Sequence, residues 1–163
     1  MNIFKKTGTM KHSEMNLHIL LIDFALFASA TICLIYGFLL VIGRLYGGKR
    51  EFVYSRFPFL QPAEIIIGAV LIAIAALMTV TFFALAKNKK IAFVLLTVDY
   101  VLLALVGIVY LTVLNRVDYH WLYAATTHSE LMFGAAKVFL AGGVAMTVIS
   151  IICCGVHRKQ FSK

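Results

Sequence analysis

Two acidic side chains lie inside long apolar stretches of the sequence. Asp23 lies in the apolar stretch 17–43, and Asp99 is the one charged residue in the stretch 91–114. An aspartate inside a membrane helix costs about 2.5 to 3.5 kcal/mol, so each side chain needs a partner or a role. If the two carboxylates approached each other, loss of solvation and mutual repulsion would favour binding of a proton or a cation. Asp23 and Asp99 are therefore the candidate proton or cation site.

A simpler interpretation of the two aspartates stays open. By helix rise, Asp23 and Asp99 lie about 9 and 12 Å from the basic ends of their stretches. At that depth water, a serine or threonine hydroxyl, or the nearby Lys89 and Lys90 could satisfy the carboxylates. On this interpretation the aspartates have no role in transport.

Three more charged residues, Glu64, Glu130 and Lys137, belong to the second and fourth apolar stretches. A carboxylate in the first helical turn complements the helix dipole, and Thr127 stands three residues before Glu130 as in a capping box. We therefore expect both glutamates to cap helices. Lys137 is almost two turns after Glu130 on the same face, so it can snorkel outward to a glutamate or to a lipid phosphate. The alternatives are an outer charge cluster of these three side chains, and contact of Lys137 with an anion or a substrate.

Small side chains indicate where the helices touch one another. Helices in lipid associate through close approach of their backbones, which glycine and alanine permit. The second and fourth stretches are rich in these residues, which favours a position at the centre of the bundle. The predicted packing residues are Gly68, Ala69, Ala73, Ala76, Gly134, Ala135, Gly142 and Gly143.

The elements that would position these residues are four apolar stretches. The chain has 163 residues, of which 62% are hydrophobic, well above the roughly 50% of soluble domains. Each stretch is long enough to cross a hydrocarbon layer of ~30 Å as a helix. The sequence therefore predicts an all-α integral membrane protein, a four-transmembrane-helix bundle in a single domain. The expected spans are 17–43, 63–86, 91–114 and 130–156, with polar tails 1–16 and 157–163.

The net charge of +8 reflects membrane topology better than a nucleic-acid partner. The basic residues stand at the ends of apolar stretches and form no face with stacking aromatic rings. On the side of the termini, the tails and the turn 87–90 contain nine Lys and Arg residues. On the other side, Arg44 and the loops 45–61 and 115–129 together contain five. The positive-inside rule thus predicts cytoplasmic termini in a cell membrane. The aromatic and basic loop 45–61 is expected to lie along the membrane surface.

The two helical hairpins resemble each other in sequence. Residues 63–69 and 129–135 share the pattern Glu-x-x-x-Gly-Ala, and residues 20–24 and 96–100 each place an aspartate before an aromatic ring. These matches predict a duplicated hairpin. Because both hairpins start on the same side, a pseudo-twofold axis along the membrane normal would relate them.

No residue pattern predicts a cofactor or a metal. His120 and His128 are eight residues apart, which is poor spacing for metal ligands. Cys33 lies in the first stretch, and the cysteines show no Cys-x-x-Cys spacing. Cys153 and Cys154 are expected either to be buried as small apolar residues or to be acylated at the membrane edge.

The expected function is that of a non-enzymatic structural, assembly or accessory subunit. Four helices with short loops leave little volume for a substrate cavity, whereas exposed apolar faces can associate with lipid, with another copy or with another membrane protein. The alternative is a small proton- or cation-coupled transporter or channel subunit that uses Asp23 and Asp99. A dry interior with charges at the interfaces would favour the first, and polar residues converging on a wet internal cavity would favour the second.

The topology prediction can be checked by labelling in intact cells. A cysteine introduced as Thr126→Cys should react with an impermeant maleimide, and one introduced as Thr7→Cys should not, because the basic bias places the termini inside. The reverse labelling pattern would overturn the orientation.

Overall fold

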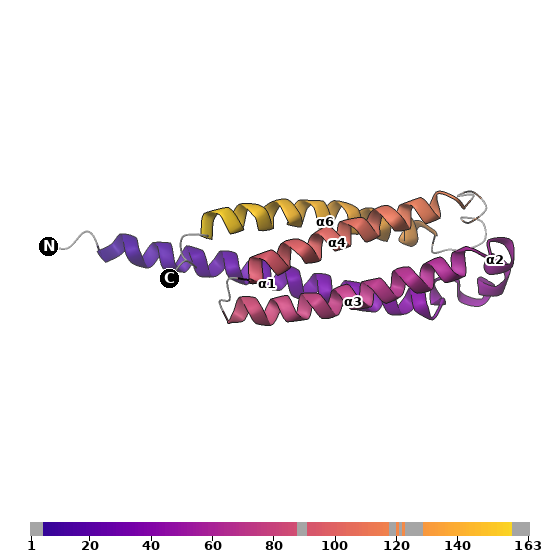
Figure 1. The fold of residues 1–163 in the computed structure, drawn as a ribbon, viewed down its shortest axis with the longest axis horizontal. Coiled ribbons are helices and arrows are strands. Elements are labelled where there is room, and N and C mark those ends of the chain that lie inside the picture. Colours follow the sequence, from indigo (N-terminus) through magenta and orange to yellow (C-terminus); the bar gives the residue numbers. More distant parts are fainter. Residues whose placement is uncertain (1–4, 88–90, 118–119, 121, 123–128, 158–163) are drawn as a thin grey trace.

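The computed structural model describes residues 5–87, 91–117, 120, 122 and 129–157, with the side chains of 5–19 and 156–157 left undescribed. The expectations for the tails, for Thr127 and for His128 fall partly or wholly outside these residues. The chain is helical throughout the described elements (Figure 1). These are α1 (Lys5–Val41), η1 (Arg44–Lys49), α2 (Arg50–Arg56), α3 (Leu60–Ala86), α4 (Ala92–Leu114) and α6 (Ser129–His157).

Four helical segments are long and apolar enough to cross a membrane. The third, α4, has 23 residues, or roughly 35 Å at the helix rise, which matches the ~30 Å hydrocarbon layer. The prediction of an all-helical chain with four membrane-length helices is confirmed. By their length and composition, these four apolar helices suggest a small membrane protein.

The helices lie alongside one another, with α1 packed on α3, α3 on α4, and α4 on α6. The beginning of α1 and the end of α6 lie at one end of the bundle, called here the terminal end, and α2 lies at the other, called the α2 end (Figure 1). The prediction that the second and fourth spans form the centre is wrong for the fourth. Within the most apolar 18 residues of each helix, 39% of the stretch is buried in α3 and 50% in α4, but only 17% in α6.

Close backbone contacts hold each helix pair together. A methyl group on Gly68 would lie 2.6 Å from the carbonyl oxygen of Gly37, so only glycine allows α1 and α3 to approach this closely. The contact between α4 and α6 at Gly143 is equally close, because a methyl group there would lie 2.6 Å from the backbone nitrogen of Ala104. These contacts follow the expected use of small residues between membrane helices.

The other two predicted glycines lie outside such contacts. A methyl group added to Gly134 or to Gly142 would meet no atom of the described part of the chain within 4 Å. Ala69, Ala73 and Ala76 are exposed, and Ala135 is half-buried and packs against the core. The glycine that makes the matching close contact in the second hairpin is Gly107, against the backbone of Leu140.

Residues matched by the proposed duplication lie in different surroundings. Gly68 is pressed against α1, whereas the aligned Gly134 faces open space. Asp99 is buried and the aligned Asp23 is half-buried. The duplication and its pseudo-twofold axis therefore stay a prediction from sequence.

The expected surface loop folds into a compact cap at the α2 end. Gly43 has φ of 63°, a left-handed conformation that ends α1 and turns the chain into η1. The side chain of Arg50 packs over Gly43, where a methyl group would meet its Nε at 2.6 Å. This turn brings η1 and α2 back over the start of α3.

The two aligned glycines provide a matched stability test. Gly68→Ala should destabilise the protein by about 1 to 3 kcal/mol, because the added methyl group overlaps the Gly37 carbonyl. Gly134→Ala should be neutral or slightly stabilising, since its surroundings are open. Thermal unfolding in detergent measures both, and equal effects would contradict the packing described here.

Candidate functional site

Glu64 is the most strongly bonded acidic residue among those described. Its side chain is 1% exposed. The Tyr46 hydroxyl donates a short hydrogen bond to Oε1, and the Tyr54 hydroxyl donates one to Oε2 at 2.9 Å. Both carboxylate oxygens are therefore satisfied inside the cap rather than by the helix terminus.

The cap places these donors because its two tyrosine rings pack against each other. The rings of Tyr46 and Tyr54 meet edge to face with centroids 5.4 Å apart. The Arg50 guanidinium lies 5.5 Å from the centroid of the Tyr54 ring, a distance at which a cation attracts the ring face. The helix α3 begins after Phe59 with no side-chain cap, so the expectation that Glu64 acts as a helix cap is not met.

Two pairs of hydroxyl groups bridge α1 and α4 inside the bundle. The Tyr36 and Tyr110 hydroxyls are 3.1 Å apart, and the Ser29 and Tyr100 hydroxyls are 3.3 Å apart. With Cys33, the α1 residues recur at intervals of four and three, so they line one helix face. A hydroxyl group both donates and accepts hydrogen bonds, so such pairs can pass a proton along.

Asp99 directly precedes Tyr100 on α4, so the two residues lie at the same height along the bundle. Asp99 has 0% exposure, and neither carboxylate oxygen has a hydrogen-bond partner within the described part of the chain. The Thr81 hydroxyl of α3 lies near enough to the Asp99 carboxyl group to act on it as a hydrogen-bond donor, although the hydrogen bond that it makes goes to the Leu77 carbonyl at 3.2 Å. A buried carboxyl group with no partner is costly in the charged form, which favours binding of a proton.

Asp23 lies apart from this position. It is half-buried, with Oδ1 buried and lacking a partner among the described residues. It precedes Ser29 by six residues, which is about 9 Å along α1 towards the terminal end. No hydrogen bond joins Asp23 to Asp99 in the described structure, because both Asp99 oxygens are without a partner there.

These groups, called here the polar column, lie at successive levels along the bundle axis: Asp99, then the Ser29–Tyr100 pair, then the Tyr36–Tyr110 pair. Ser29 and Tyr36 are seven residues apart, so about 10 Å of α1 separates the two hydroxyl pairs. Tyr110 follows Asp99 by eleven residues, or about 16 Å of helix rise. Glu64 and its two tyrosines lie beyond it at the α2 end.

A small cavity borders the middle of the column. Its volume is about 80 Å³, and Ser29, Cys33 and Tyr100 supply the polar atoms of its wall. The rest of the wall is apolar, and the cavity opens towards the exposed residues Ile32 and Val138. A cavity needs roughly 10 to 15 Å³ of such volume, and two or more polar partners, to hold a water molecule. The cavity therefore has room for a few water molecules beside the hydroxyl groups.

Glu130 and Lys137 meet around a different hollow, between the end of α4 and the start of α6. Its volume is about 820 Å³, and both charged side chains on its wall are exposed. Asn115 adds a polar group, and Phe133 and Leu111 add apolar ones. Of the predicted outer charge cluster, the structure brings these two residues together and places Glu64 in the cap instead.

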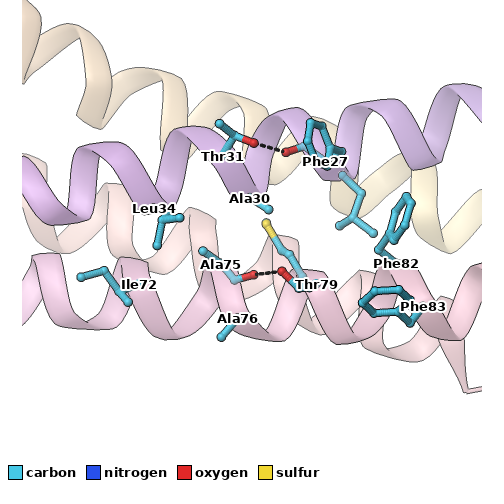
Figure 2. A pocket seen from close by; sticks show the side chains of 12 residues that line it. Phe27, Ala30, Thr31, Leu34, Ile72, Ala75, Ala76, Thr79, Phe82 and Phe83 are labelled. Atoms are coloured by element: carbon cyan, nitrogen blue, oxygen red, sulfur yellow. Dashed lines mark hydrogen bonds between the residues drawn. The ribbon is translucent and has the colours of Figure 1, made fainter.

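An apolar groove of about 400 Å³ runs between α1 and α3, lined by twelve side chains (Figure 2). Its two threonine hydroxyls are already used within their own helices. Thr31 donates to the Phe27 carbonyl and Thr79 to the Ala75 carbonyl, each at 2.9 Å. The groove is thus suited to an apolar occupant, such as a lipid chain or the side chains of another helix.

Comparisons of the chain with protein families, with curated proteins and with solved structures find no match. Within the described residues, no three His, Cys, Asp or Glu side chains are grouped as metal ligands.

Sequence reasoning missed the tyrosines that line the interior. Tyr36, Tyr100 and Tyr110 lie in apolar stretches, where a buried tyrosine needs a partner for its hydroxyl group. That requirement was the available signal. Tyr46 and Tyr54 were interpreted as residues of the membrane interface, because a position at the headgroups also satisfies a tyrosine.

The cap makes a prediction for a double-mutant cycle. Tyr46→Phe should lower the free energy of unfolding by about 1.5 to 3 kcal/mol, because it removes a hydrogen bond to a buried carboxylate. In a Glu64→Leu background the same change should have little effect, since the acceptor is gone. Thermal unfolding of the four proteins measures the coupling, and purely additive effects would contradict the contact.

Proposed function

We propose that this small membrane protein conducts protons through its interior. Asp99 is the proton-binding group, Asp23 is the entry from the terminal end, and Glu64 is the exit group at the α2 end. The tyrosine and serine hydroxyls between Asp99 and Glu64 relay the proton. The observation that carries the proposal is the complete burial of Asp99 with both oxygens lacking a partner in the described residues.

The position of the charges supports this role over a purely structural one. A structural bundle would keep its charges paired or at the membrane interfaces, but Asp99 is 0% exposed and lies about two turns inside α4. Burial of such a carboxyl group costs stability unless it is used or paired. The column between Asp99 and Glu64 consists of groups that can both donate and accept a hydrogen bond.

The small size of the cavity beside the column favours a proton over a larger solute. About 80 Å³ beside Ser29 and Tyr100 accommodates a few water molecules. A hydrated cation would need a wider passage lined by several oxygen ligands. Protons need only hydrogen-bonded groups within reach of one another.

A second candidate is an accessory subunit that acts through helix association with another copy or another membrane protein. Two observations favour it. Only 17% of the most apolar 18-residue stretch of α6 is buried, and an apolar groove lies between α1 and α3. In this role the buried polar groups fix the packing of the bundle and bind no transported proton.

Proton flux into liposomes distinguishes the two candidates. The full chain, reconstituted with a pH-sensitive dye inside the vesicles, should acidify them under an imposed potential faster than protein-free vesicles. Asp99→Asn and Glu64→Gln should each reduce the flux at least about tenfold, because the amide cannot bind and release a proton at that site. Tyr36→Phe should also reduce it.

The matched control is Glu51→Gln, which removes an exposed carboxylate at the α2 end. It should leave the flux unchanged. Absence of flux from folded protein, or flux that survives Asp99→Asn, would contradict proton conduction. In that case a membrane protein that co-purifies in mild detergent would support the accessory role.

A further inference from the structure

The hollow between α4 and α6 combines opposite charges with apolar walls. Lys137 and Glu130 are both exposed on its wall. They are seven residues apart on α6, which is about 10 Å along the axis on nearly the same face. Side chains on a helix lean towards its N-terminus, so the Lys137 ammonium group is able to reach towards Glu130.

The hollow also lies where the head group of a lipid would be. It is bounded by the end of α4 and the start of α6, both at the α2 end of the bundle (Figure 1). Leu111 and Phe133 supply apolar surface on the same wall, and Asn115 supplies a polar amide. Its volume of about 820 Å³ is large enough for a small polar molecule.

We propose that this hollow binds the phosphoethanolamine head group of a membrane lipid, with Lys137 on the phosphate and Glu130 on the ammonium group. The order of the two charged side chains along α6 matches the order of the charged groups in the lipid head group. Lys137 is the deeper residue and Glu130 the outer one, and in the lipid the phosphate is attached to the glycerol and the ammonium group follows it. The apolar walls then contact the glycerol and the start of the acyl chains.

The charges discriminate between common head groups. A primary ammonium group donates hydrogen bonds to the Glu130 carboxylate, whereas the quaternary ammonium of phosphatidylcholine has no hydrogen to donate. Phosphatidylglycerol offers a phosphate for Lys137 but no cation for Glu130. The site should therefore prefer phosphatidylethanolamine to both.

Binding can be measured with lipids that carry a fluorophore on an acyl chain, added to the full chain in lipid-depleted detergent. Phosphatidylethanolamine should bind about tenfold more tightly than phosphatidylcholine or phosphatidylglycerol. Lys137→Gln should weaken its binding about tenfold, and Glu130→Gln should reduce it to the level of phosphatidylcholine. Lys137→Arg should retain binding and serves as the folded, charge-preserving variant.

Lys49→Gln and Glu51→Gln are the matched controls, because they remove exposed charges at the same end but outside the hollow. Both should bind like the unaltered chain. Equal binding of the three lipids, or unchanged binding in folded Lys137→Gln and Glu130→Gln, would overturn the proposal. Competition by soluble phosphoethanolamine at the lipid's own concentration would overturn the lipid assignment and indicate a free solute. None of these outcomes depends on proton conduction.

Discussion

The constraint on which this structure depends is the absence of water around polar groups in the hydrocarbon layer. A polar side chain inside the bundle has to find its partner in the protein, or else remain unsatisfied at a cost. Glu64 finds two tyrosine hydroxyls, and the Tyr36 and Tyr110 hydroxyls find each other. Asp99 is the described residue with two buried oxygens that lack a hydrogen-bond partner, and this points to a role beyond packing.

The close glycine contacts and the large tyrosines serve complementary purposes. Gly68 allows α1 and α3 to touch, and Gly143 allows α4 and α6 to touch. The space between the two pairs is wider and is occupied by aromatic side chains, including the Tyr36 and Phe139 rings with centroids 5.5 Å apart. Tight pairs at the sides therefore leave room in the middle for a column of hydroxyl groups.

The sequence predicted the four long apolar helices because length and hydrophobicity are local properties of the chain. It could not predict the partners of Glu64, because they depend on the turn at Gly43 that folds the cap over α3. Nor could it separate Gly68 from Gly134, which share a local pattern but face different surroundings. The expected position of the fourth span at the bundle centre was wrong, since small residues show that close contact is possible without showing how much of a helix is covered.

Proton binding by Asp99 is most directly tested by infrared difference spectroscopy of the full chain in lipid after a change of pH. Proton exchange at Asp99 predicts a carboxyl C=O stretching band that appears on acidification and is missing in Asp99→Asn, with the amide I signal of the helices unchanged. A spectrum without such a band, or one in which the band survives Asp99→Asn, would show that the buried carboxyl group does not exchange a proton and would contradict the account.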